Sequence, residues 1–309
     1  MEPDEETGRA LHDPGSVFWA PGFEGGPDDG LDDGAVFDCS VANIARVYDY
    51  WLGGKDNYQA DREAGDAVAE SAPWIVSGVR ANRSFLCRAV KDLALAGVDQ
   101  FVDIGSGLPT ARNVHEVAQA VNPAARVVYV DNDVLVATFA RALLATDERT
   151  VAIEGDAREP ARIIDDLELR GHIDWARPVA VLFVAVLHFL TDDDDPGARV
   201  ATFREVMTPG SHLVISHVTP GTEEQKPGMD TAVTTYRAST GEFTTRTREQ
   251  ITRLFDGFDL IPPGLVGVDR WRAWSNRPDG HLPMLAGVGR LPEERPSDVS
   301  TSGGGDRLS

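Results

Sequence analysis

The chain has 309 residues, of which 42% are hydrophobic, so it can form one large α/β domain with an added segment or two small domains. Its formal net charge of −21 argues against a nucleic-acid partner, because binding a phosphate backbone needs a basic surface. No leader-like segment opens the chain and no apolar run is long enough to span a bilayer, so we expect a cytoplasmic protein without membrane contact. The spacing of Cys39 and Cys87 fits neither a metal site nor a redox pair, and we expect reduced thiols.

Both ends of the chain are poor in apolar residues. The first 37 residues are rich in Gly, Pro, Asp and Glu, and the residues from 291 onward are rich in Pro, Ser and Gly. Such segments cannot bury enough apolar surface to fold alone, so we predict disordered tails over residues 1–37 and 291–309. The aromatic residues Phe18, Trp19 and Phe23 leave open that part of the first tail docks on the folded domain.

Helices precede the first strand. An apolar stripe at helical spacing in residues 41–51 predicts a helix that ends at Gly53, a C-cap residue. A second helix is expected to start near Asp61, and a third runs from about residue 79 to residue 96. Residues 38–98 therefore stand where a lid or an edge helix of an α/β enzyme would be.

The stretch Phe101–Pro109 is typical of a buried strand, a tight glycine turn and the start of a helix. Gly105 and Gly107 allow positive φ angles and let a ligand approach the backbone. Thr110 is expected to cap the next helix, whose free N–H groups would point at the turn. Asp103 adds an acceptor for a ligand ammonium or for an N–H group of the loop. A strand, turn and helix without any ligand is the alternative.

A second strand, Arg126–Asp131, ends in a carboxylate 24 residues after Gly107. That is where nucleoside-binding α/β folds place the acidic residue that accepts from the ribose hydroxyls. The third glycine of a dinucleotide fingerprint is replaced by Pro109 and Thr110, which argues against a pyrophosphate over the loop. A nucleoside without phosphate, such as S-adenosylmethionine, is compatible with these residues.

A third strand, residues 151–153, leads into a polar turn. In a nucleoside-binding sheet this turn lies beside the base. The Asp156 carboxylate could accept from an adenine amino group, and the backbone N–H of Ala157 could meet a ring nitrogen. The alternative is that Asp156 only caps the helix that starts near Pro160.

Residues 178–187 are the most apolar run and should form the central fourth strand, with its carboxyl end beside the glycine turn. His188 follows directly. It could be a general base or a substrate contact, or it could be a structural histidine beneath the cofactor. The four acids Asp192–Asp195 are expected to open a helix capped by Thr191 rather than bind a metal, because consecutive carboxylates on a first turn diverge.

The rest of the chain completes a sheet. We expect a fifth strand, an insertion with a short helix that shapes a substrate pocket, a further helix, and a closing antiparallel strand pair. The fifth strand is expected over residues 211–218, and the insertion over residues 219–246 with its helix at 231–238. The further helix is expected over residues 247–255, and the closing strands over residues 258–261 and 282–289.

Several of these stretches resemble one known family. They are Ala45–Arg62, Phe101–Pro109, Asn113–Ala118, Val128–Asp133 and Gly155–Arg158. Over roughly residues 38–290 the chain is similar to an actinobacterial family, formerly a domain of unknown function, of S-adenosylmethionine-dependent methyltransferase-like proteins. The resemblance implies a class I methyltransferase fold and bound S-adenosylmethionine, and it supplies no substrate.

We therefore predict a doubly wound α/β fold over residues 99–290, with a mostly parallel seven-stranded sheet and an N-terminal helical lid. The first functional hypothesis is a methyltransferase that uses S-adenosylmethionine on an unidentified small-molecule acceptor. Without an Asn-Pro-Pro-Tyr or Asp-Pro-Pro-Tyr run, an adenine amino or glutamine amide acceptor is disfavoured. The second hypothesis is a sensor or interaction module that binds the cofactor without methyl transfer. An NAD-dependent oxidoreductase is the weakest, since the third glycine and a Tyr-x-x-x-Lys pair are missing.

The expected site has four parts and no metal. The methionine end would lie on Asp103, Gly105, Ser106 and Gly107. The ribose would lie on Asp131 with Asn132 beside it, and the adenine on Asp156 and Ala157. Tyr48, Gly53, Asn57 and Arg83 are expected to close over the cofactor, because a lid before the first strand needs a polar, glycine-hinged segment.

Overall fold

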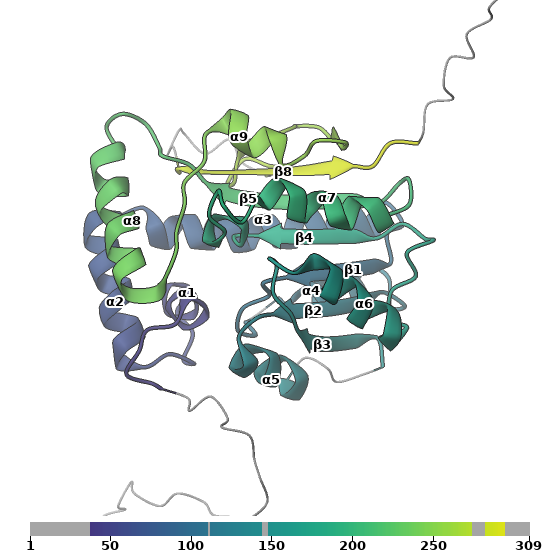
Figure 1. Cartoon of the computed structure of the whole chain (residues 1–309), viewed down its shortest axis with the longest axis horizontal. Helices are drawn as coiled ribbons and strands as arrows, with labels where there is room; N and C mark the ends of the chain where they lie inside the picture. The colour runs from purple at the N-terminus through teal and green to yellow at the C-terminus, as the bar shows by residue number, and fades with distance from the viewer. Residues whose placement is uncertain (1–37, 111, 144–147, 274–281, 294–309) are drawn as a thin grey trace, which may run out of the picture. The chain divides into compact units, whose positions relative to one another are not determined.

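The computed structural model describes residues 38–110, 112–143, 148–273 and 282–293 (Figure 1). The tail predicted over residues 1–37 lies outside the described residues, as does nearly all of the tail predicted over residues 291–309. None of the helices in the described part is long and apolar enough to cross a lipid bilayer.

Parallel strands that are buried along most of their length form the centre of the sheet. They are β1 (Gln100–Ile104), β2 (Arg126–Asp131), β3 (Thr150–Glu154), β4 (Ala180–Val184) and β5 (His212–Val218). At one edge, β8 (Met284–Arg290) runs antiparallel to β5, and β6 (Asp259–Leu260) runs antiparallel to β8. The order β3-β2-β1-β4-β5-β8-β6 confirms the predicted doubly wound, mostly parallel fold and its closing antiparallel pair.

The sheet differs from the prediction at two places. Over the described residues it has eight strands rather than seven, because β7 (Val266–Gly267) also pairs with β8. Two residues are too few to show strand alternation in a sequence. In addition, β4 ends three residues earlier than expected. Ala185 takes the left-handed conformation, with φ 61°, and a short 3-10 helix, η1 (Leu187–Phe189), follows.

Helices cover both faces of the sheet and enclose two hydrophobic cores. One core contains Phe101 and Val127 and is covered by α3 (Ile75–Leu95), α4 (Val114–Gln119) and α5 (Val134–Leu143). The other contains Val102 and Val128 and is covered by α6 (Pro160–Arg170), α7 (Pro196–Val206) and α9 (Arg248–Arg253). In Figure 1, α3 lies behind the sheet while α6 and α7 lie in front. Neighbouring residues of one strand face opposite cores, as the period of a strand requires.

The remaining helices stand beyond the carboxyl ends of the parallel strands. They are α1 (Ile44–Leu52), α2 (Gln59–Ser71) and α8 (Lys226–Thr240), on the left in Figure 1. Helices α2 and α8 pack closely at Gly228. A Cβ added to this glycine would lie 2.6 Å from the carbonyl oxygen of Ser71. The insertion predicted to carry a short helix therefore folds as a 15-residue helix that packs on the N-terminal helices.

Two predicted helix caps are wrong. Thr110 does not cap α4; the cap is Asn113, which forms a capping box with Glu116, and the Thr110 N–H donates to the Asn113 Oδ1 atom. Asp195, not Thr191, caps α7 by accepting from the N–H of Ala198. In both cases a side chain three or four residues further on has the better reach to the first free N–H groups. Gly53 does end α1 in the left-handed conformation, with φ 83°, as expected.

Candidate functional site

The glycine turn after β1 has the predicted backbone. Gly105 and Gly107 have φ angles of 67° and 65°, and the N–H groups of Gly105 and Ser106 both donate to the carbonyl oxygen of Val130, at 2.7 and 3.1 Å. A Cβ on Gly105 would lie 2.3 Å from a methyl group of Val186, so only glycine fits there. A Cβ on Gly107 would meet nothing within 4 Å, so the backbone of Gly107 borders open space that a ligand can enter.

The structure brings Asp131 to this turn. One carboxylate oxygen accepts from the N–H of Gly107 at 2.8 Å, and the other accepts from the N–H of Asp133 at 3.1 Å. Burial raises the pKa of Asp131 to about 6, although these two hydrogen bonds work in the opposite direction. A carboxylate has about four lone-pair sites, so this group can still accept from a ribose hydroxyl pair. This capacity fits the role predicted for Asp131 at a ribose.

A carboxylate comes before the turn and a guanidinium contacts the segment after it, namely Asp103 on β1 and Arg83. Asp103 is buried, and burial raises its pKa to about 7, whereas the charge of Arg83 works to lower it. Arg83, on α3, donates through Nη2 to the carbonyl oxygen of Arg112 at 3.1 Å and to the Oδ1 atom of Asn113 at 3.2 Å. A carboxylate before the turn and a guanidinium after it would suit a zwitterionic ligand group such as an amino acid.

The turn after β3 holds the residues predicted to meet the adenine. Asp156 accepts a forked ion pair from Arg158, with contacts of 2.6 to 3.0 Å, and sequence reasoning gave Arg158 no role. Burial tends to raise the pKa of Asp156, but the hydrogen bonds and charge of Arg158 lower it, with a further hydrogen bond from Asn132. Ala157 is buried in the second core. The Asp156 carboxylate therefore has a partner of its own chain, which an adenine amino group would have to share.

The structure divides the four predicted lid residues into two pairs. Arg83 contacts Arg112 and Asn113 in the segment that follows the glycine turn, and the Tyr48 hydroxyl accepts from Asn82, the residue before Arg83 on α3. Asn57 instead donates to the Asp49 carboxylate at 2.9 Å and to the Gly54 carbonyl oxygen at 3.1 Å. Asn57 and Gly53 therefore belong to the turn between α1 and α2, and the Asp49 carboxylate is the acceptor that holds this turn.

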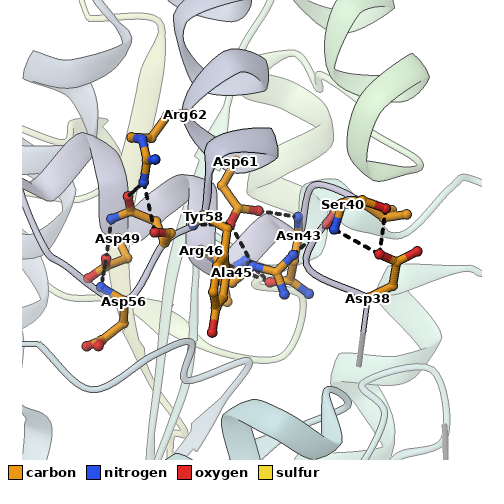
Figure 2. Close-up of polar contacts among 12 residues, drawn as sticks. Asp38, Ser40, Asn43, Ala45, Arg46, Asp49, Asp56, Tyr58, Asp61 and Arg62 are labelled. Atoms are coloured by element: carbon orange, nitrogen blue, oxygen red, sulfur yellow. Dashed lines mark hydrogen bonds and ion pairs between the residues drawn. The ribbon is translucent and has the colours of Figure 1, made fainter. Parts of the chain in front are cut away.

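A buried ion pair organises this N-terminal segment, and sequence reasoning missed it. Arg46 and Asp61 are both buried and meet at 2.7 Å, and Asp61 also accepts from the N–H groups of Asn43 and Tyr58, each at 2.8 Å (Figure 2). The Asn43 side chain then donates to the Asp133 carboxylate at 2.6 Å. Because Asp133 itself holds a contact to Asp131, this hydrogen bond links α1 to the predicted ribose site.

His188 lies on η1 and is buried. Its ring packs against the rings of Phe189, Phe243 and His217, with centroids 4.4, 4.9 and 5.5 Å away. Burial, together with the positive fields of His217 and Arg246, holds the pKa of His188 well below its usual value, so its imidazole is neutral. In the part of the chain that the structure describes, its Nδ1 atom has no hydrogen-bond partner. The packing fits a structural histidine, and the neutral nitrogen fits a base.

A second buried arginine, also missed, fastens the segment after β4. Arg246 comes from the insertion and is buried. It donates to the carbonyl oxygens of Leu187 and Leu190 at 2.8 and 2.9 Å, contacts the Nε2 atom of His217 at 3.0 Å, and pairs with Asp192 at 2.8 Å. Over the described ranges, no group of three or more His, Cys, Asp or Glu residues is placed to hold a metal ion.

The fold and the site define a class before any relative is considered. A sheet in this order, a glycine turn after β1 and a carboxylate that ends β2 and holds that turn form the arrangement predicted for class I methyltransferases. The family model described as S-adenosyl methyltransferase matches residues 32–292. The chain belongs to this family of S-adenosylmethionine-dependent methyltransferases.

Two solved structures are similar over nearly their whole length. A DUF574 family protein from Streptomyces avermitilis MA-4680 is 42% identical, with a TM-score of 0.78 over 82% of this chain and 99% of that one. A candidate methyltransferase from Thermobifida fusca YX is 40% identical, with a TM-score of 0.77 over 82% of this chain and 96% of that one. No curated protein matches the sequence.

Cofactor affinity should depend on pH through Asp103 and Asp131. Their pKa values are about 7 and about 6, and each accepts hydrogen bonds best when ionised. Acid protonates both groups in the free protein, and these protons must leave before the ligand binds. Affinity for S-adenosylhomocysteine should therefore be constant near pH 8, fall from about pH 7 and fall more steeply below about pH 6. Calorimetric titration across this range measures the profile. Asp131→Asn should abolish the steeper fall, and an unchanged profile in this variant would contradict the assignment.

Proposed function

We propose that this protein transfers the methyl group of S-adenosylmethionine to a small-molecule acceptor. The observation that carries the proposal is the Asp131 carboxylate, which is buried, held by the N–H of Gly107, and placed beside the open space over Gly107. This place lies at the carboxyl ends of β1 and β2, next to the point where the strand order reverses between β1 and β4, which is where such sheets bind ligands.

The residues present fit each part of the cofactor. Asp131 accepts from the ribose hydroxyls, Asp103 accepts from the ammonium group, and the open space at Gly107 lets the cofactor approach the backbone of the turn. Asn132, Asp156 and Ala157 form the adenine side, with Arg158 holding the Asp156 carboxylate in place. When bound, S-adenosylmethionine supplies an activated sulfonium methyl group, so the protein needs chiefly to align the acceptor with it.

His188 is our candidate for the base, if the acceptor must lose a proton. Its neutral imidazole stands just after β4, and its buried Nδ1 atom has no hydrogen-bond partner in the described structure. The acceptor is proposed to be small because a net charge of −21 disfavours an anionic polymer. The tight ring packing around His188 favours the second candidate function, a cofactor-binding protein without methyl transfer.

Calorimetric titration of the purified protein with S-adenosylmethionine, S-adenosylhomocysteine and NAD tests the proposal. We expect both sulfur nucleosides to bind and NAD not to bind. Asp131→Ala should weaken both by about 10- to 100-fold, since hydrogen bonds to a charged group contribute about 1.5–3 kcal/mol each. Asp99→Ala is the matched control, because Asp99 pairs with Arg177 at the opposite end of β1.

Binding of NAD alone, or equal affinity in Asp131→Ala and the wild type, would overturn the cofactor site. Formation of S-adenosylhomocysteine with any acceptor from a panel of phenols, amines, thiols and carboxylic acids would eliminate the function without methyl transfer. A profile of acceptor turnover against pH that shifts in His188→Ala would support the base.

A further inference from the structure

A chain of buried hydrogen bonds crosses the carboxyl end of the sheet. The N–H of Ala185, just after β4, donates to the Ser216 hydroxyl on β5 at 2.9 Å. Ser216 donates to the Oδ1 atom of Asn82 on α3 at 2.6 Å, and the Nδ2 atom of Asn82 donates to the Tyr48 hydroxyl on α1 at 2.9 Å. Ser216 and Asn82 are 0% and 1% exposed, so water does not compete for these contacts. The chain joins four elements that are far apart in the sequence.

The direction of this chain follows from its first member. A backbone N–H can only donate, so the Ser216 oxygen is an acceptor there, and its single proton goes to Asn82. The amide of Asn82 then has its N–H groups for Tyr48. Because the Tyr48 oxygen accepts from Asn82, its own proton must point elsewhere. The contact found for that proton in the described structure is the carbonyl oxygen of Val79, at 3.4 Å. An O–H···O hydrogen bond is usually about 2.7–2.8 Å long, so the proton is weakly held.

Charged groups near Tyr48 indicate what that proton could meet. Burial raises the pKa of the Tyr48 phenol, so it stays protonated, while the charge of Arg83 reaches it and works in the opposite direction. Arg83 follows Asn82 on α3 and contacts the Asn113 side chain, just beyond the glycine turn that Asp103 precedes. A protonated phenol and a guanidinium near this turn can both donate to an anion, and the Asp103 carboxylate can accept from a cation.

We propose that the Tyr48 hydroxyl donates to the α-carboxylate of the methionyl part of the cofactor, beside Arg83, and that Asn82 and Ser216 are positioning residues that aim it. On binding, the Tyr48 proton exchanges its long contact with Val79 for this carboxylate. The inference rests on the proposed function, and it adds the group that recognises the amino-acid end of the ligand and the residues that orient that group.

Two ligands separate recognition of the amino-acid end from recognition of adenosine. S-adenosylhomocysteine has the carboxylate and the ammonium, and 5′-methylthioadenosine has the same nucleoside without either. Calorimetric titration of Tyr48→Phe should show about tenfold weaker binding of S-adenosylhomocysteine, equal to about 1.4 kcal/mol, and unchanged binding of 5′-methylthioadenosine. Tyr50→Phe is the matched control on the same helix, because the Tyr50 hydroxyl bonds the exposed Asp66 at 2.8 Å. It should change neither affinity.

A second variant tests the positioning role and does not remove the phenol. In Asn82→Asp both side-chain oxygens are acceptors, so the Tyr48 hydroxyl should turn and donate to the new carboxylate. This variant should lose affinity for S-adenosylhomocysteine by about as much as Tyr48→Phe, with affinity for 5′-methylthioadenosine again unchanged. The thermal unfolding curve of each variant is measured first, and all titrations are made at a temperature at which every variant is folded.

The outcomes are distinct. Unchanged affinity of both variants for S-adenosylhomocysteine would overturn the inference while leaving the cofactor site standing. Equal losses of affinity for the two ligands would also overturn it. Hydrogen bonds that only stabilise the fold would affect binding of the whole nucleoside, not of its amino-acid end alone. Failure of the wild-type protein to bind either ligand would overturn the proposed function and the inference together.

Discussion

Asp61→Ala is expected to lower the free energy of unfolding by about 3–5 kcal/mol, which is the usual cost of removing one partner of a buried ion pair. The Asp61 side chain is 0% exposed and accepts from the Arg46 guanidinium at 2.7 Å (Figure 2). Its loss removes the carboxylate that faces the buried Arg46 guanidinium and the acceptor of two backbone N–H groups, those of Asn43 and Tyr58. Urea-induced unfolding measures the change.

Two controls isolate the buried charge. Asp66→Ala removes a carboxylate of the same helix that accepts from Tyr50 at the surface, so its cost should be below about 1 kcal/mol. Asp61→Asn keeps the shape and one acceptor and should fall between the two. If Asp61→Ala cost no more than Asp66→Ala, the ion pair would not hold α1 and α2 together.

The central fold could be predicted because its signals are local. Each parallel strand is a short apolar run, and Gly105 and Gly107 follow the first of them where a turn is needed. The signals fail where an element is short or where its neighbours decide its length. β7 has two residues and carries no pattern. The insertion helix extends to 15 residues because it packs on α2, which a reading of residues 219–246 alone does not reveal.

The candidate site likewise has residues that the sequence could identify and residues that it could not. The spacing of Gly107 and Asp131 predicts that both border one ligand site, since the carboxyl ends of neighbouring parallel strands meet at one edge of the sheet. The hydrogen bond between them is a finding of the structure. The roles of Arg46, Arg246 and Asn82 could not be predicted. Each of them is a polar residue whose partners come from another element, and a sequence shows its polarity without showing what faces it.

These contacts indicate that the N-terminal helices do more than cover the predicted site, because they also hydrogen-bond to the loops that form it. The Asn43 side chain reaches Asp133 beside the ribose carboxylate, and Tyr48 connects through Asn82 to the ends of β4 and β5. Both links run from α1 to loops that border the predicted cofactor. The long sequence signature from residue 45 to residue 62 is thus explained by the helices that carry these links and by the ion pair that stabilises them.

Gly105→Ala should lower the free energy of unfolding by about 2–5 kcal/mol and, with it, cofactor binding. The left-handed φ of 67° costs an alanine about 1–2 kcal/mol, and its Cβ at 2.3 Å from the Val186 methyl adds an overpacking cost of about 1–3 kcal/mol. Gly107→Ala is the matched control, with a φ of 65° and no atom within 4 Å of its Cβ. It should lose only about 1–2 kcal/mol of stability.

Val186→Ala separates the cost of the clash with Val186 from the cost of the left-handed backbone. In the double variant Gly105→Ala/Val186→Ala the clash is removed and the strain of the left-handed backbone remains. The double-mutant cycle should therefore return a favourable coupling of about 1–3 kcal/mol between the two sites, whereas Gly107→Ala should show none with Val186→Ala. Additive effects at positions 105 and 186 would mean that the turn relaxes around a methyl group. The close approach of Val186 would then not be what keeps residue 105 a glycine.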